Sequence, residues 1–133
     1  MTLAIRSTAL AVLVGLLLAA CGMPAAGTRN GTLQVIAGEN FWGSIAAQLG
    51  GSHVSVTSIV TNPNTDPHDY ESSATDARAF ATADYVVLNG AGYDDWGQKL
   101  LSANPSQNRK VFTVAELLNK KAGNNEHFWY NPD

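Results

Sequence analysis

Two histidines that lie far apart in this 133-residue chain have the residue type and the setting for metal binding. His68 stands in the run Asp-Pro-His-Asp-Tyr-Glu over residues 66–71, and His127 comes directly before an aromatic run. Neutral imidazole is the commonest protein ligand for transition metals. Pro67 stiffens the approach to His68, and a stiff loop suits a ligand that must be held closely on a metal. Each histidine also has an interpretation that involves no metal. In this interpretation His68 is an ordinary residue of an exposed polar loop, and His127 is a buried residue whose ring is hydrogen-bonded to a carbonyl group.

The carboxylates near these histidines have better explanations than metal binding or catalysis. We expect Asp69 and Glu71 to order the loop around the first histidine, and Asp76 to face solvent on a helix. His53 belongs to a segment of alternating polarity and is expected to pack or to face water. The sequence has no Gly-x-Ser-x-Gly motif, and residues 90–92 lack the third glycine of a dinucleotide-binding loop.

The N-terminus has the pattern of an export signal. Residues 1–20 combine a single positive residue with an apolar run that is too short to span a bilayer comfortably. The run ends in Leu-Ala-Ala directly before Cys21, the only cysteine, and this pattern resembles a bacterial lipobox in which Cys21 is diacylated and becomes the mature N-terminus. The alternative is an ordinary secretory signal followed by a free thiol. Residues 21–32 are rich in Gly, Ala, Pro and Thr and are expected to form a flexible tether between the lipid and a folded domain.

Charge and cysteine content restrict the remaining possibilities. The formal net charge is −3 and no basic stripe is present, which argues against a nucleic-acid partner. A single cysteine excludes an intramolecular disulfide. Residues 33–133 are long enough for one small domain and too short for two ordinary ones.

Apolar runs and turn residues predict an α/β fold in which strands alternate with helices. The predicted strands are residues 33–37, 53–60, 84–88 and 109–114. The first predicted helix starts at residue 39 or 40 and runs to about 49, the second starts at 72 or 73 and runs to about 82, and the third spans about 94–103, followed by a short helical turn over 114–119. Such an order predicts a parallel sheet flanked by helices. His68 follows the second strand and His127 follows the fourth strand and its short helix. Because ligands collect at the carboxyl ends of parallel strands, we expect the two histidines to converge on one rim of the sheet.

The order of the motifs carries a resemblance to a known family. The matching segments are Glu39-Asn40-Phe41, the Gly50-Gly51 turn, residues 66–71, residues 89–96 from Asn-Gly-Ala-Gly to Trp, and His127-Phe128-Trp129. These motifs follow a lipobox-like pattern in the sequence. In this order they resemble the motifs of the metal-binding lipoproteins that serve ABC importers of zinc and manganese, the cluster A-I solute-binding proteins. The chain is similar to the N-terminal lobe of that two-lobed fold, from about residue 33 to its end.

The resemblance implies a role for each histidine. His68 and His127 match the first two metal ligands of the family, while a third histidine or a glutamate and then an aspartate come from the C-terminal lobe. That lobe is not in this sequence, which ends at Asp133, so we expect a truncated chain. The sequence also departs from the family in having Asn131-Pro132 where Asp-Pro is usual.

The resulting functional prediction is a binding protein without catalytic residues. It would capture Zn²⁺ or Mn²⁺ for the permease of an ABC importer while lipid-anchored at the extracytoplasmic face of the cell membrane, either periplasmic or at the cell surface. Histidines must be neutral to bind, so uptake is expected to weaken below about pH 6. Two alternatives remain: a metal-dependent hydrolase that uses Asp69 or Glu71 as a base, and a surface adhesin that keeps the same fold.

Overall fold

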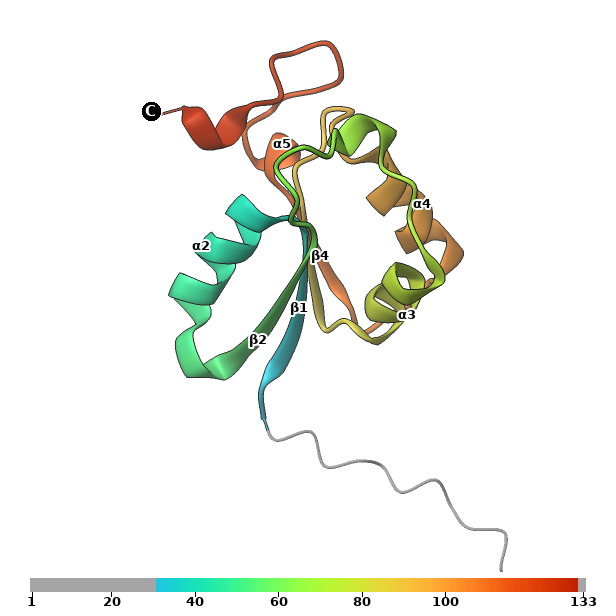
Figure 1. Cartoon of the computed structure of the whole chain (residues 1–133). Coiled ribbons are helices and arrows are strands. Elements are labelled where there is room, and N and C mark those ends of the chain that lie inside the picture. Colours follow the sequence, from blue (N-terminus) through green and yellow to red (C-terminus); the bar gives the residue numbers. More distant parts are fainter. Residues whose placement is uncertain (1–30, 132–133) are drawn as a thin grey trace, which may run out of the picture. The chain divides into compact units, whose positions relative to one another are not determined.

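The computed structural model describes residues 31–131 and contains a four-stranded sheet flanked by helices (Figure 1). The strands are β1 (Leu33–Glu39), β2 (Val54–Val60), β3 (Tyr85–Leu88) and β4 (Lys110–Thr113). All neighbouring pairs are parallel, and the strand order is β2-β1-β3-β4. The predicted α/β class with a parallel sheet is therefore confirmed. The predicted signal segment and Cys21 lie outside the described residues, as does most of the tether.

The helices lie where the sequence predicts them. They are α2 (Asn40–Gly50), α3 (Ala74–Thr82), α4 (Asp95–Ala103) and the short α5 (Val114–Leu117). The start of α3 is fixed by a capping box, in which the Ser73 hydroxyl accepts hydrogen bonds from Thr75 N and Asp76 N and the Asp76 carboxylate accepts one from Ser73 N. Its carboxylate also accepts a hydrogen bond from Tyr70 Oη at 3.0 Å. Asp76 thus lies on a helix as expected, and its half-buried side chain also satisfies the helix start.

The second strand begins one residue later than predicted. The Gly50-Gly51 pair ends α2, with Gly51 at φ 52°, and a 3-10 turn over Gly51–His53 then leads into β2. His53 therefore lies in this exposed turn instead of in the strand, at the amino end of the sheet and away from the loops that carry the other histidines.

Each face of the sheet has its own apolar core. Figure 1 shows α2 on one side of the strands and α3 and α4 on the other. The cluster beneath α3 and α4 consists of Ile36, Val60, Phe80, Ala83, Val86, Leu88, Trp96 and Leu100. The cluster on the α2 side consists of Val35, Ala37, Val87, Val114, Ala115 and Phe128. Each large side chain buried here contributes about 1.5–3 kcal/mol to stability, so both faces stabilise the sheet whose rim carries the candidate ligands.

One buried cation joins the amino end of β4 to the two helices on its side. Arg109 is 9% exposed, and its guanidinium donates hydrogen bonds to the carbonyl oxygens of Phe80 at 2.7 Å and Asn104 at 2.5 Å. These carbonyls lie at the ends of α3 and α4, where helices leave acceptors without intrahelical partners.

In the described residues, no helix has the length and apolar character needed to cross a membrane.

Candidate metal-capture site

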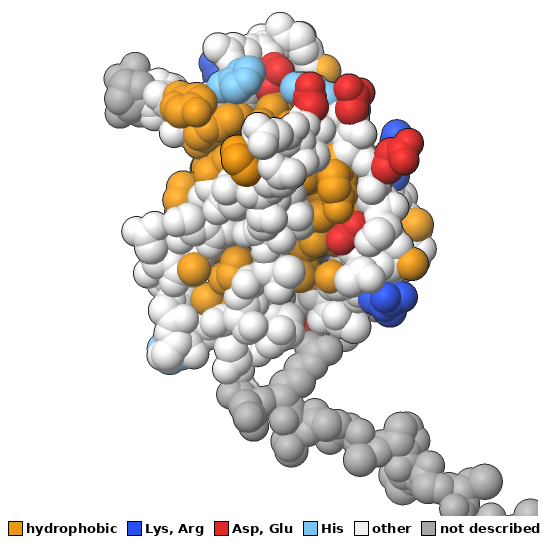
Figure 2. Space-filling view, in the orientation of Figure 1, with side chains coloured by type: hydrophobic (Ala, Val, Ile, Leu, Met, Phe, Trp, Pro, Cys, Tyr) orange, Lys and Arg blue, Asp and Glu red, His pale blue; other side chains and the backbone are white. Residues whose placement is uncertain are grey.

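The two predicted ligand histidines line one pocket at the carboxyl edge of the sheet. The pocket has a volume of about 370 Å³ and is formed by Pro63, Asn64, Thr65, Asp66, Pro67, His68, Tyr93 and His127. Figure 2 shows histidine, acidic and apolar side chains gathered at this end of the lobe. The expectation that residues after β2 and after β4 converge on one rim is confirmed.

Asp66 orders the loop that carries His68. Its backbone is extended (φ −75°, ψ 118°), as Pro67 requires, and the chain then makes a 3-10 turn over Pro67–Asp69. Asp66 Oδ1 accepts one hydrogen bond from His68 N at 3.0 Å and a second from the ring Nδ1 at 2.8 Å. The loop was expected to be ordered by Asp69 and Glu71, but both are exposed and Asp66 has this role instead. The bond from Asp66 raises the pKa of His68 above its usual value, and it lowers the pKa of Asp66.

The loop that carries His127 has the same local design. Asn125 Oδ1 accepts a hydrogen bond from His127 N at 3.0 Å and lies 2.9 Å from the ring Nδ1. In both loops, therefore, a side-chain oxygen two residues before the histidine engages Nδ1. Such an outer partner fixes the tautomer and leaves Nε2 as the atom that can bind a metal.

Tyr93 lies between the two imidazoles. Its ring centroid is 5.0 Å from that of His68 and 5.9 Å from that of His127, and both pairs meet edge to face. The side chain is 7% exposed, and burial followed by the nearby Glu39 raises the pKa of Tyr93 to about 12. The phenol is therefore neutral at physiological pH and serves as a rigid spacer between the two histidine loops.

A buried carboxylate shapes the turn that presents Tyr93. Asp94 Oδ2 accepts a hydrogen bond from Asn89 N at 2.6 Å, and Oδ1 accepts one from Gly90 N at 2.8 Å. Burial raises the pKa of Asp94 although these two donors act in the opposite direction. Gly90 has φ 77°, and a Cβ at this position would collide with Thr113 and Ala115, so the turn requires glycine.

Asn89, at the end of β3, joins α2 to the loop of the second histidine. Its Oδ1 accepts a hydrogen bond from Trp42 Nε1 at 3.1 Å, and its Nδ2 donates to the backbone oxygen of Glu126 at 3.0 Å. Trp129 continues this connection by stacking on Phe41 with a centroid distance of 3.8 Å. The loop that carries His127 is thus held by contacts to the sheet and to α2.

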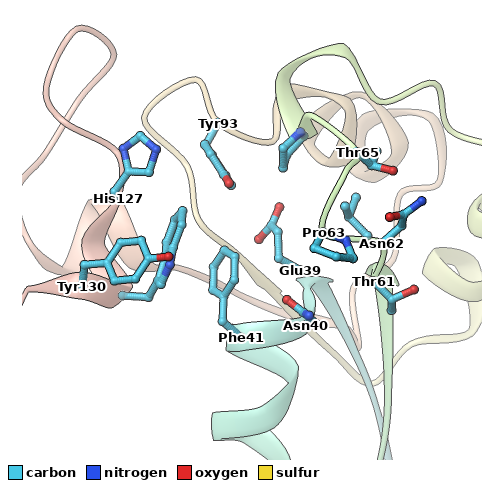
Figure 3. Close-up of a pocket in the computed structure, with 13 residues that line it drawn as sticks. Glu39, Asn40, Phe41, Thr61, Asn62, Pro63, Thr65, Tyr93, His127 and Tyr130 are labelled. Atoms are coloured by element: carbon cyan, nitrogen blue, oxygen red, sulfur yellow. The ribbon is translucent and has the colours of Figure 1, made fainter.

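Glu39 occupies the centre of the sheet edge without a hydrogen-bond partner among the described residues. It ends β1, is 1% exposed, and lines a second pocket of about 330 Å³ together with Tyr93 and His127. Figure 3 shows the carboxyl group directed into the space beside Tyr93, with His127 across the pocket. Burial, followed by the charge of Asp94, raises the pKa of Glu39 to about 9. It ends β1, and the strand order reverses between β1 and its neighbour β3, at the kind of position where α/β sheets characteristically bind ligands.

Glu126 makes a direct side-chain contact between the two histidine loops. Its Oε1 lies 3.2 Å from His68 Nε2, while the next residue in the chain is His127. Within the part of the chain that the structure describes, no three His, Cys, Asp or Glu side chains are already arranged to hold a metal. Sequence reasoning missed Glu39, Asn125 and Glu126. A local signal existed only for Asn125, because Asn125 precedes His127 by two residues, as Asp66 precedes His68.

Comparison with known proteins settles the family. Residues 35–133 match the family model of the zinc-uptake complex component A, periplasmic (ZnuA). The chain belongs to this family. Its relatives include the metal ABC transporter substrate-binding lipoprotein FimA of Streptococcus parasanguinis, 29% identical over 134 residues, and the manganese-binding lipoprotein MntA of Bacillus subtilis, 31% identical over 123 residues. The matches cover 91% and 86% of this chain but 42% and 40% of the relatives, so the chain spans about two fifths of their length.

A solved structure agrees on the fold of this ZnuA-family lobe. The periplasmic metal binding protein from Candidatus Liberibacter asiaticus is similar with a TM-score of 0.57 at 24% sequence identity. The similarity covers 71% of this chain and 33% of that protein. The family and the parallel α/β fold expected from the resemblance are both confirmed.

Proposed function

We propose that residues 33–133 form the N-terminal lobe of an extracytoplasmic substrate-binding lipoprotein that captures Zn²⁺ or Mn²⁺ for an ABC importer. The names of FimA and MntA, a metal transporter lipoprotein and a manganese-binding lipoprotein, support this cargo and this partner. His68 and His127 are the proposed ligands in this lobe. We assign the ligands of a second lobe and the permease contacts to the parts of the relatives that this chain does not span.

The observation that carries the proposal is the matched pair of imidazoles. Both line one pocket, and in both a side-chain oxygen two residues earlier engages Nδ1. Metal-ligating histidines characteristically have such an outer partner, which orients the ring and fixes its tautomer, and both loops supply one.

The proposal includes a lipid anchor. Residues 1–20 would direct export and be removed, and Cys21 would carry the acyl chains that hold the protein at the outer face of the membrane. Residues 21–32 would then allow the lobe to reach a permease. Mass spectrometry of the membrane-extracted protein tests this, because diacylation of Cys21 adds a large mass that Cys21→Ser must abolish.

We propose a transport role and not catalysis. Two imidazoles that line one pocket can hold a cargo ion, and the named relatives are substrate-binding and metal-binding lipoproteins. The distinction is measurable in the complete protein. A cargo site closed by protein ligands excludes exchangeable metal-bound water, whereas a catalytic metal retains it.

The central experiment measures metal binding by the purified chain. We expect His68→Ala and His127→Ala each to weaken Mn²⁺ and Zn²⁺ binding by at least about 10-fold, as loss of even an outer partner of a ligand does. His53→Ala is the matched control, because this histidine lies in an exposed turn remote from the pocket. Equal affinity of all three variants and the unmodified chain would refute the proposal.

A further inference from the structure

The carboxylate of Glu126 lies beside the ring atom of His68 that a metal would bind. Because Asp66 engages Nδ1 of His68, Nε2 is the ring atom left for a metal, and this atom lies 3.2 Å from Glu126 Oε1. Two donors that bind one cation at about 2.1–2.2 Å and at right angles are separated by roughly 3 Å. In this structure the two atoms form a hydrogen bond, and a cation that displaces the proton between them would have both donors within reach.

The backbone beneath this carboxylate is fixed while the side chain remains accessible. Asn89 Nδ2 donates to the Glu126 carbonyl oxygen at 3.0 Å, and the side chain of Glu126 is 24% exposed. The side chain reaches from the loop after β4 to the loop after β2, so it lies between the two histidines that we propose as ligands. A cation entering the pocket meets this carboxylate together with the imidazole of His68.

We propose that Glu126 is a third metal ligand of this lobe, and that it shifts the preference of the site from Zn²⁺ towards Mn²⁺. This inference rests on the proposed function, since it requires His68 and His127 to bind the same ion. The resulting set of two imidazoles and one carboxylate suits ions of octahedral preference and leaves further positions open. No three such groups surround a common point in the described residues, so binding of one ion by all three side chains requires them to rearrange.

The chemical reason for the shift is the hardness of the donor. Carboxylate oxygen suits Mn²⁺, whereas imidazole nitrogen alone suits Zn²⁺, which is satisfied by four tetrahedral ligands. Zn²⁺ retains the higher intrinsic affinity for most donor sets, so the prediction concerns the change in the ratio of the two affinities and not their order. Removing the carboxylate should weaken the binding of Mn²⁺ more than the binding of Zn²⁺.

The test compares Glu126→Gln and Glu126→Ala with the unmodified chain, with exposed Glu116→Gln as the matched control. Free Mn²⁺ is measured by electron paramagnetic resonance, and Zn²⁺ by competition with a coloured chelator. We expect both Glu126 variants to weaken Mn²⁺ binding by about 10–100-fold and Zn²⁺ binding by several-fold less, while Glu116→Gln changes neither.

A second readout separates a ligand from a residue that merely orients His68. Co²⁺ bound to the unmodified chain should lose a donor in Glu126→Ala, which changes the position and intensity of its visible absorption bands; an orienting residue would leave the bands unchanged. Unchanged bands, or equal losses for Mn²⁺ and Zn²⁺, would overturn the role of Glu126. If His68→Ala and His127→Ala also bind metal normally, the proposed function itself fails, and this outcome differs from failure of Glu126 alone.

Discussion

Asn89 Nδ2 donates a hydrogen bond to the backbone oxygen of Glu126, 37 positions further along the chain, and thereby joins the end of β3 to the loop of the second histidine. The same amide accepts a hydrogen bond from Trp42 Nε1 on α2. Asn89 is completely buried, so these bonds replace ones that water would otherwise make. A single buried side chain thus helps to fix where a loop 37 positions further along the chain places its proposed ligand.

Replacing Asn89 with alanine should therefore weaken both the fold and metal binding. Leaving Trp42 Nε1 and the Glu126 carbonyl without their partner should lower the free energy of unfolding by about 1–3 kcal/mol. Because His127 loses its anchor, we also expect metal affinity to fall by about 10-fold. Urea denaturation and isothermal titration measure the two effects. Asn108→Ala on the exposed surface is the control, and a fall in stability without a fall in affinity would contradict the anchoring role.

The hydrogen bond from His68 to Asp66 makes a prediction about pH. It raises the pKa of His68, so protons compete with the metal at a higher pH than for a free histidine. Asp66→Asn keeps an acceptor for Nδ1 but removes the negative charge, and we expect the pKa of His68 to fall. The midpoint of the pH dependence of metal binding should then move to lower pH.

Proton NMR of the imidazole ring measures the first effect, and metal titrations between pH 5.5 and 8 measure the second. Asp69→Asn in the same loop is the matched control, because its side chain is exposed and Asp66 provides the acceptor for the ring. An unaltered His68 pKa in Asp66→Asn would show that the ring does not depend on this carboxylate.

The buried carboxyl of Glu39 predicts the pH dependence of stability. Its pKa is raised from 4.5 to about 9, so the folded protein holds a proton that the unfolded chain releases near pH 4.5. A carboxyl group whose pKa is raised by folding contributes its full share to the free energy of unfolding below the pKa of the unfolded chain. This contribution is lost as pH rises from 4.5 to about 9, by up to about 1.4 kcal/mol per pH unit. Glu39→Gln has no proton to release, so its free energy of unfolding should decline less over this range and exceed that of the unmodified chain at pH 8.

Urea denaturation at pH 5, 6, 7 and 8 tests this prediction. Glu71→Gln, a substitution of the same kind at an exposed position, should keep the pH dependence of the unmodified chain. Parallel curves for Glu39→Gln and the unmodified chain would mean that Glu39 is ionised in the folded protein.

The sequence predicted the fold and the convergence of the histidines because both depend on local patterns. Apolar runs such as Tyr85–Leu88, alternating with helices, require a parallel sheet, and parallel strands bring the loops after them to one edge. The histidine positions follow from this topology alone. The start of β2 was placed one residue early because alternation extends through His53, whereas the glycine pair before it forms a turn.

The surroundings of the histidines depend on tertiary contacts that a linear pattern does not contain. Glu126 reaches His68 across 58 positions, and the burial of Glu39 follows from loops that close over the end of β1. Asp66, Asp69 and Glu71 are chemically alike, and only the 3-10 turn decides that Asp66 accepts the bonds of His68. Asp76 differs, because its role in the capping box is local: Ser73 and Asp76 have the Ser-x-x-Asp spacing that is typical of a helix start.

Asp94 provides a test of whether the turn at the end of β3 positions Tyr93. Both oxygens accept backbone hydrogen bonds, from Asn89 N and Gly90 N. Asp94→Asn replaces one oxygen with an amide group whose hydrogens face a backbone N–H, so one buried donor loses its acceptor and the free energy of unfolding should fall by about 1–3 kcal/mol. Because Tyr93 lies between the two imidazoles, metal affinity should fall together with stability.

The control is Asp95→Asn, an exposed substitution at the start of α4 that should lower the free energy of unfolding by no more than about 1 kcal/mol through the helix dipole. If the two variants lose the same stability and bind metal equally well, the turn does not depend on the buried carboxylate.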